Sequence, residues 1–220
     1  MRTHDTSPSH RACSAFPFLT LSEFEEACQA LADRCTSAQD GWSIRLLTKP
    51  GTGFRITKYI ASSEATDLDS QEDDPVCRFP APRERVHLCD PSPQEALVRT
   101  QPSLQVDYDI VWSPTYQVPV LYFGLRSHSH GPLGLDEVYQ YVVPEQYRQQ
   151  LKNVGVMGGI SMGYHPDSGA PAFFVHPCNT ADAIAHLADA QSVSPGSYLL
   201  IWLGLVGHCV NLHVPRELVA

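Results

Sequence analysis

This 220-residue chain has little that would suit a membrane, a secretory route or a nucleic acid. No apolar run approaches the roughly 20 residues that a membrane-spanning helix needs. The N-terminus lacks the basic start and apolar centre of a secretory signal, so we do not expect secretion. Lysine is scarce and the formal net charge is -9, which would repel nucleic acid and favour a protein partner with a basic face.

Paired cysteine motifs are also absent. The chain has 7 cysteines at irregular spacings, with no CxxC pair among them. A disulfide framework predicts an even number of cysteines, and a structural zinc site predicts paired ones. We therefore expect reduced thiols, most of them buried as small apolar side chains. Cys28 and Cys35 fit this interpretation, because both lie on the apolar face of one predicted helix.

The apolar patterns predict the α+β fold class, with an N-terminal helix and a four-stranded antiparallel sheet followed by helices. The first helix covers residues 20–35 and begins with a capping box between Thr20 and Glu23. Residues 153–171 are rich in glycine and predict a loop. The predicted strands cover 42–47, 54–60, 104–112 and 118–125, a short extended segment covers 173–175, and further helices cover 135–143, 180–190 and 198–207.

We predict a single domain over residues 20–220, preceded by a flexible tail over residues 1–19. Residues 61–103 are acidic and rich in proline, which predicts a disordered insertion within the domain. The acidic patch in this insertion is explained by a solvated loop or by a docking segment for a basic partner.

One cysteine stands in an unusual setting, in the sequence FFVHPC at residues 173–178. The β-prone run stops at a proline, and Asn179 and Thr180 are good N-cap residues for the helix that follows. A helix N-terminus favours negative charge and so favours the reactive thiolate form of Cys178. His176 lies two residues earlier and is expected to face the same side. A buried cysteine at a helix cap would explain the same local pattern, so both interpretations stay open at this point.

Two other uses of this thiol are disfavoured. A cysteine protease needs an oriented base and a carboxamide or carboxylate, and the papain-type and caspase-type signatures are absent. A metal site at His176 and Cys178 would lack further ligands at the usual spacing.

The HPC motif at residues 176–178, preceded by FFV, resembles the active-site signature of the autophagy ubiquitin-like-conjugating enzymes. The sequence YQVPVLYF at residues 116–123 is similar to a second motif of this family, a strand in the middle of the sheet. The residues around Trp202 and Val206 fit the family as well. The resemblance covers about residues 20–60 and 104–215, and it implies the core fold of ubiquitin-conjugating enzymes.

The family has two branches, and the wording of residues 116–119 is closer to the Atg ten type. This branch accepts the ubiquitin-like modifier Atg twelve from the activating enzyme Atg seven and passes it to a lysine of the acceptor Atg five. The other branch attaches a modifier to phosphatidylethanolamine and has an amphipathic N-terminus, which residues 1–19 do not show. The lipid-conjugating sibling and an inactive adaptor of the same fold are the alternatives.

The resemblance implies that Cys178 carries the C-terminal glycine of the modifier as a thioester. It implies that His176 gives polar support beside the thioester and that Tyr116 faces the same cleft, although sheet packing alone would also explain Tyr116. It further implies a cytoplasmic protein that is recruited to the pre-autophagosomal site and needs no cofactor or metal. The tripeptide at 165–167 is similar to the His-Pro-Asn motif of ordinary ubiquitin-conjugating enzymes, but an ionised Asp167 cannot donate a hydrogen bond to an oxyanion. We therefore interpret Asp167 as a loop residue.

Overall fold

The computed structural model describes residues 11–35, 43–47, 53–60, 104–127, 131–155, 159–188 and 193–214. The elements in chain order are α1 (Leu21–Cys35), β1 (Ser43–Leu46), β2 (Phe54–Ile60), β3 (Leu104–Ser113), β4 (Val118–Ser127), β5 (Gly131–Pro132), α2 (Leu135–Glu137), a π-helical turn (Val138–Val142), α3 (Glu145–Val154), β6 (Ile160–Tyr164), β7 (Pro171–Val175), a 3₁₀ turn (Pro177–Asn179), α4 (Thr180–Leu187), α5 (Pro195–Gly207) and a last 3₁₀ turn (His208–Val210). The α+β class is confirmed.

All described strands form one antiparallel sheet of 7 strands in the order β1-β2-β3-β4-β7-β6, with β5 paired to the end of β4. The prediction of four strands is therefore wrong. Strand β6 lies inside the segment that was expected to be a glycine-rich loop, and it pairs with β7 from Ile160↔Val175 to Tyr164↔Pro171. Its five residues alternate between large and small side chains, but the run is short and Met162 and Tyr164 are exposed, so pairing with β7 decides their conformation.

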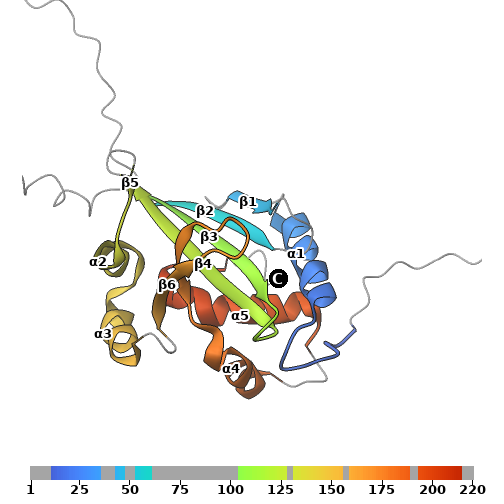
Figure 1. The fold of residues 1–220 in the computed structure, drawn as a ribbon. Helices are drawn as coiled ribbons and strands as arrows, with labels where there is room; N and C mark the ends of the chain where they lie inside the picture. The colour runs from blue at the N-terminus through green and yellow to red at the C-terminus, as the bar shows by residue number, and fades with distance from the viewer. Residues whose placement is uncertain are drawn as a thin grey trace, which may run out of the picture.

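Helices α1 and α5 contact each other and form the core with one face of the sheet (Figure 1). Phe24 of α1, Tyr108 of β3 and Trp202 of α5 are among the largest fully buried side chains. The predicted capping box of α1 is confirmed, because the Thr20 N–H donates to Glu23 Oε2 at 3.0 Å and the Glu23 N–H donates to Thr20 Oγ1 at 3.3 Å.

The segment before α1 packs against the core. Leu19 is 0% exposed, and its carbonyl oxygen accepts a hydrogen bond from Trp112 Nε1 at 2.8 Å. Cys13 is also buried, and its N–H donates to the Val193 carbonyl oxygen. The expectation of a flexible tail over residues 1–19 therefore does not hold for this part of it, and residues 1–10 lie outside the described residues.

The second face of the sheet carries polar residues of β3. The alternating pattern of this strand predicts that they are exposed to solvent, but they are buried. Asp107 is 9% exposed and Asp109 is 6% exposed. Their partners come from β2, β4 and the β6–β7 loop, so distant segments cover this face. These contacts fix the hairpin of β6 and β7, which leads directly into Cys178.

Helix α3 was not predicted, because its sequence is polar and only Leu151 is buried in it. The predicted disordered insertion at 61–103 lies outside the described residues and stays a prediction; its ends join β2 and β3 at the pair Ile60↔Leu104. Within the described ranges, no helix is both long enough and apolar enough to cross a membrane.

Candidate active site

Cys178 lies in the middle of the 3₁₀ turn (Pro177–Asn179) that joins β7 to α4. Nδ1 of His176 accepts the backbone N–H of Cys178 at 3.2 Å. Helix α4 begins at Thr180, and Asn179 occupies its N-cap position without a side-chain hydrogen bond. The His176 side chain therefore caps the turn that contains Cys178. The side chain of Asn179, which the sequence favoured as a helix cap, makes no capping hydrogen bond to α4.

This hydrogen bond determines which nitrogen of His176 carries the proton. Nδ1 is an acceptor, so the neutral imidazole has its proton on Nε2. Among the described residues, Nε2 has no hydrogen-bond partner, and the side chain is half-buried. His176 therefore offers an N–H donor within the turn that holds the thiol.

Tyr116 lies against His176 from the turn between β3 and β4. The two ring centroids are 5.7 Å apart and the planes meet at 78°, an edge-on contact. The turn is held by the Gln117 N–H, which donates to the Ser113 carbonyl oxygen at 2.7 Å, and Gln117 itself has a positive φ of 53°. Tyr116 is 38% exposed, so it is a surface residue and not part of the core. The structure thus brings Tyr116, His176 and Cys178 together at one end of the sheet.

A third ring at this place, that of Phe174, did not emerge from the sequence as a functional residue. Phe174 of β7 lies 6.1 Å from His176, centroid to centroid, with 37° between the planes. On its other side it contacts Tyr122 of β4 at 5.5 Å. The strand period offered the signal, because residues 174 and 176 of an extended segment lie on the same face.

The remaining described cysteines are poor nucleophiles. Burial raises the pKa of Cys28 to about 12, and it raises the pKa values of Cys13 and Cys209 to about 11. These three side chains hold very little thiolate at neutral pH. The expectation that Cys28 is a buried packing residue is confirmed.

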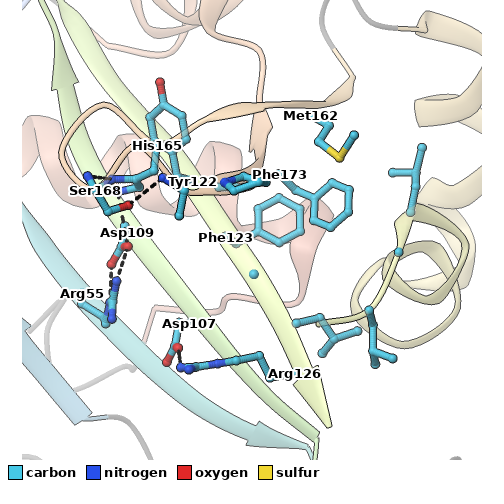
Figure 2. A pocket seen from close by; sticks show the side chains of 18 residues that line it. Arg55, Asp107, Asp109, Tyr122, Phe123, Arg126, Met162, His165, Ser168 and Phe173 are labelled. Atoms are coloured by element: carbon cyan, nitrogen blue, oxygen red, sulfur yellow. Dashed lines mark hydrogen bonds and ion pairs between the residues drawn. The ribbon is translucent and has the colours of Figure 1, made fainter. Parts of the chain in front are cut away.

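A second cluster of polar groups lies on the same sheet face, around the buried carboxylate of Asp109 (Figure 2). Arg55 donates to it from Nε and Nη2, both at 2.6 Å, and His165 Nε2 lies 3.3 Å from Oδ2. Nδ1 of His165 accepts the N–H groups of Asp167 at 3.2 Å and Ser168 at 3.3 Å. Asp167 therefore belongs to the β6–β7 loop, as expected.

Burial alone would raise the pKa of Asp109. The hydrogen bonds and charges of Arg55 and His165 more than offset that effect, so the pKa lies below its ordinary value. Asp109 is thus held as a carboxylate, and the cluster anchors the β6–β7 loop to the sheet.

A cavity of about 530 Å³ opens beside this cluster. Figure 2 shows Phe123, Phe173 and Met162 on its apolar side, away from Arg55 and Asp109. Cys178, His176 and Tyr116 do not line it. In the part of the chain that the structure describes, no three His, Cys, Asp or Glu side chains could hold a metal ion together.

Comparison with known proteins decides the family. A family model described as "Autophagocytosis associated protein, active-site domain" matches residues 23–217. The chain belongs to this family. Its HPC turn lies within the matched residues, as do β4 and α5.

Named relatives of this autophagocytosis-associated chain agree with the match. The ubiquitin-like-conjugating enzyme ATG10 of Gibberella zeae is 33% identical, over 92% of this chain and 97% of that protein. The human protein of the same name is 33% identical over 51% of each chain, and that of Arabidopsis thaliana is 34% identical over 51% of each. A crystal structure of the autophagic E2 Atg10 aligns with 12% identity and a TM-score of 0.49, covering 86% of this chain and 94% of that one.

The sequence-based prediction of an autophagy conjugating enzyme of the Atg ten type is therefore confirmed for the family and the enzyme class. The autophagocytosis-associated chain is a conjugating transferase.

Proposed function

We propose that this enzyme carries the ubiquitin-like modifier Atg twelve as a thioester on Cys178, receives it from the activating enzyme Atg seven and transfers it to a lysine of Atg five. The observation that carries the proposal is the turn itself. A half-exposed cysteine is held by its backbone N–H against His176, in a chain of the conjugating family. Burial raises the pKa values of the Cys13 and Cys28 thiols, which disfavours the thiolate at those two positions.

The proposed chemistry has two acyl-transfer steps. The Cys178 thiolate attacks the thioester carbonyl that joins the modifier's C-terminal glycine to the activating enzyme, and the thiolate of that enzyme leaves. A neutral lysine amine of the acceptor then attacks the new thioester. An isopeptide bond forms, the Cys178 thiolate leaves, and the amine loses a proton to water or a base.

In this proposal the neighbouring rings act on the second step. The Nε2–H of His176 supplies a donor near the thioester, and Tyr116 helps to position the groups that react. The motif at 165–167 does not take this role, because His165 is buried against Asp109. The reaction is expected in the cytoplasm, with recruitment to the pre-autophagosomal site.

A gel assay tests the thioester. Wild-type enzyme incubated with Atg seven, ATP and Atg twelve should give an adduct that disappears with thiol reductant. Cys178→Ala should give none, and Cys178→Ser should give an oxyester that reductant does not cleave. Cys209→Ala is the matched control and should charge normally. Failure of the wild-type enzyme to form an adduct with active partners would favour the inactive adaptor.

A second assay tests the acceptor. The charged enzyme is offered Atg five in one reaction and phosphatidylethanolamine vesicles in another. We expect discharge to the protein lysine and none to lipid. Transfer to lipid alone would overturn the assignment and favour the lipid-conjugating branch.

A further inference from the structure

A row of aromatic and imidazole rings crosses the outer face of the sheet from His165 to Tyr116 and includes His176. The centroid distances are 5.2 Å from His165 to Tyr122, 5.5 Å from Tyr122 to Phe174 and 6.1 Å from Phe174 to His176. Tyr116 closes the row at 5.7 Å from His176. His176 thus contacts two rings, Tyr116 edge-on and Phe174 at a tilt of 37°.

Phe174 is itself fixed from two sides. It pairs across the sheet with Tyr122, whose ring it contacts. On the β6 side it lies over Gly163, where an added Cβ would meet Phe174 Cε1 at 3.1 Å and Cδ1 at 3.7 Å. The ring of Phe174 therefore occupies the space that a side chain at position 163 would need, and this glycine leaves it undisplaced.

The far end of the row is anchored in the buried ion pair. His165 contacts the ring of Tyr122, has its Nε2 3.3 Å from Asp109 Oδ2 and accepts two backbone N–H groups at Nδ1. Arg55 holds Asp109 with two hydrogen bonds. Asp109 and His165 are buried, and each is held by more than one contact, so they have little rotational freedom and support the ring of Tyr122 beside them.

We propose that Phe174 is a positioning residue, which sets the ring plane of His176 and, through the Nδ1 hydrogen bond, the backbone of Cys178. The inference rests on the proposed function of Cys178 and extends it to a residue outside the HPC motif. The imidazole plane decides whether Nδ1 reaches the Cys178 N–H, and it decides the direction of the Nε2–H donor. Removing the ring of Phe174 leaves His176 with only one of these two ring contacts.

The main test compares substitutions on one strand. Phe174→Leu should lower the rate of single-turnover discharge to the acceptor lysine by about tenfold at saturating acceptor, with KM unchanged. The extent of thioester formation should not change. Phe174→Tyr keeps a ring and should stay within about twofold of the wild-type rate. Gly163→Val, whose Cβ would meet only the ring of Phe174 within 4 Å, should slow discharge in the same direction as Phe174→Leu.

Phe173→Leu is the matched control, since the neighbouring Phe173 is 7% exposed and packs on Phe123 on the opposite face. It should lower the melting temperature yet leave the discharge rate unchanged well below that temperature. A wild-type rate for Phe174→Leu, or an equal loss for Phe173→Leu, would overturn the positioning role.

Nitrogen NMR of the enzyme without bound modifier tests the proposal in the absence of any partner protein. The wild type should show His176 protonated at Nε2, and Phe174→Leu should show mixed tautomers and a shifted Cys178 amide signal, with Phe173→Leu unchanged at both. Unchanged His176 and Cys178 signals in Phe174→Leu would contradict the proposal. Because this measurement is made without modifier, failure of the thioester assay and failure of the positioning role are distinguishable.

Discussion

Two His-Pro turns in this molecule share one local geometry and differ in the burial of the histidine and in the residue after the proline. In the turn at 165–167 and in the turn at 176–178, Nδ1 of the histidine accepts the backbone N–H two residues later at 3.2 Å. Each imidazole also meets a tyrosine ring edge-on, at 5.2 Å from Tyr122 and 5.7 Å from Tyr116.

The surroundings separate them. His165 is 6% exposed and its Nε2 lies against Asp109, whereas His176 is half-buried and, among the described residues, its Nε2 is unpaired. The third residue of one turn is an aspartate, and that of the other is a thiol. In each turn the histidine therefore fixes the backbone of the residue that follows the proline. The chemistry available there depends on the identity of that residue and on its access to solvent.

Moving the thiol from one turn to the other is the most severe test of this difference. The double variant Cys178→Ala with Asp167→Cys should form no thioester adduct, because Nε2 of His165 lies against Asp109 and offers no free donor beside position 167. The single variant Asp167→Ala should still form the thioester adduct at 20 °C. This temperature is used because the substitution can also lower the stability of the fold. Circular dichroism would verify folding in both, and an adduct mapped to position 167 would remove the distinction between the turns.

Asp109→Ala should have the next largest effect, on stability. It leaves Arg55 and His165 without their buried partner, so the free energy of unfolding should fall by about 3 kcal/mol in urea titrations. Thioester formation at low temperature should survive. Asp136→Ala, at an exposed position of α2, is the control and should change stability by less than about 0.5 kcal/mol. Equal losses in the two variants would mean that the cluster contributes nothing special.

Substituting each histidine by asparagine separates the two turns directly. The amide oxygen can replace Nδ1 as the acceptor, but the Nε2 group is lost. His165→Asn should cost about 1–2 kcal/mol in urea unfolding, because Asp109 loses a partner. His176→Asn should change stability by less than about 0.5 kcal/mol and slow lysine transfer in single-turnover assays. A larger loss of stability in His176→Asn than in His165→Asn, with lysine transfer unchanged, would show that His176 has the structural role.

The smallest effect is a pH dependence carried by Asp109. Its pKa is lowered in the folded state, so its contribution to stability is fully present above the unfolded value of about 3.9 and is lost as pH falls through the folded value. The difference in unfolding free energy between wild type and Asp109→Asn should be constant above about pH 5 and shrink below about pH 4. A difference that grows on acidification would have the wrong sign for this carboxylate.

Local rules predicted the parts of the fold that depend on neighbours in the sequence. The capping box of Thr20 and Glu23, the β1–β2 hairpin and strands β3 and β4 all follow from short patterns, and the structure confirms them. Strand β6 and helix α3 were missed because neither carries a long apolar stripe. Their conformation depends on β7 in one case and on burial of Leu151 in the other.

The sequence predicted which residues form the site, but it did not predict how they contact one another. The HPC motif drew attention to Cys178 and His176, but the hydrogen bond from the cysteine N–H to Nδ1 needs the actual turn. The cluster of Arg55, Asp109 and His165 joins residues 54 or more positions apart, and no local pattern relates them. Asp109 looked like a solvent-facing residue of an alternating strand for the same reason.

The most direct test of the central claim is peptide mapping of the charged enzyme by mass spectrometry. Enzyme incubated with Atg seven, ATP and Atg twelve is digested at mildly acidic pH, with and without reductant. The account predicts the modifier's C-terminal peptide joined to the peptide containing Cys178, with loss of one water, and release of both peptides by reductant. A modifier joined to any other cysteine, or joined to none while the activating enzyme itself is charged, would contradict it.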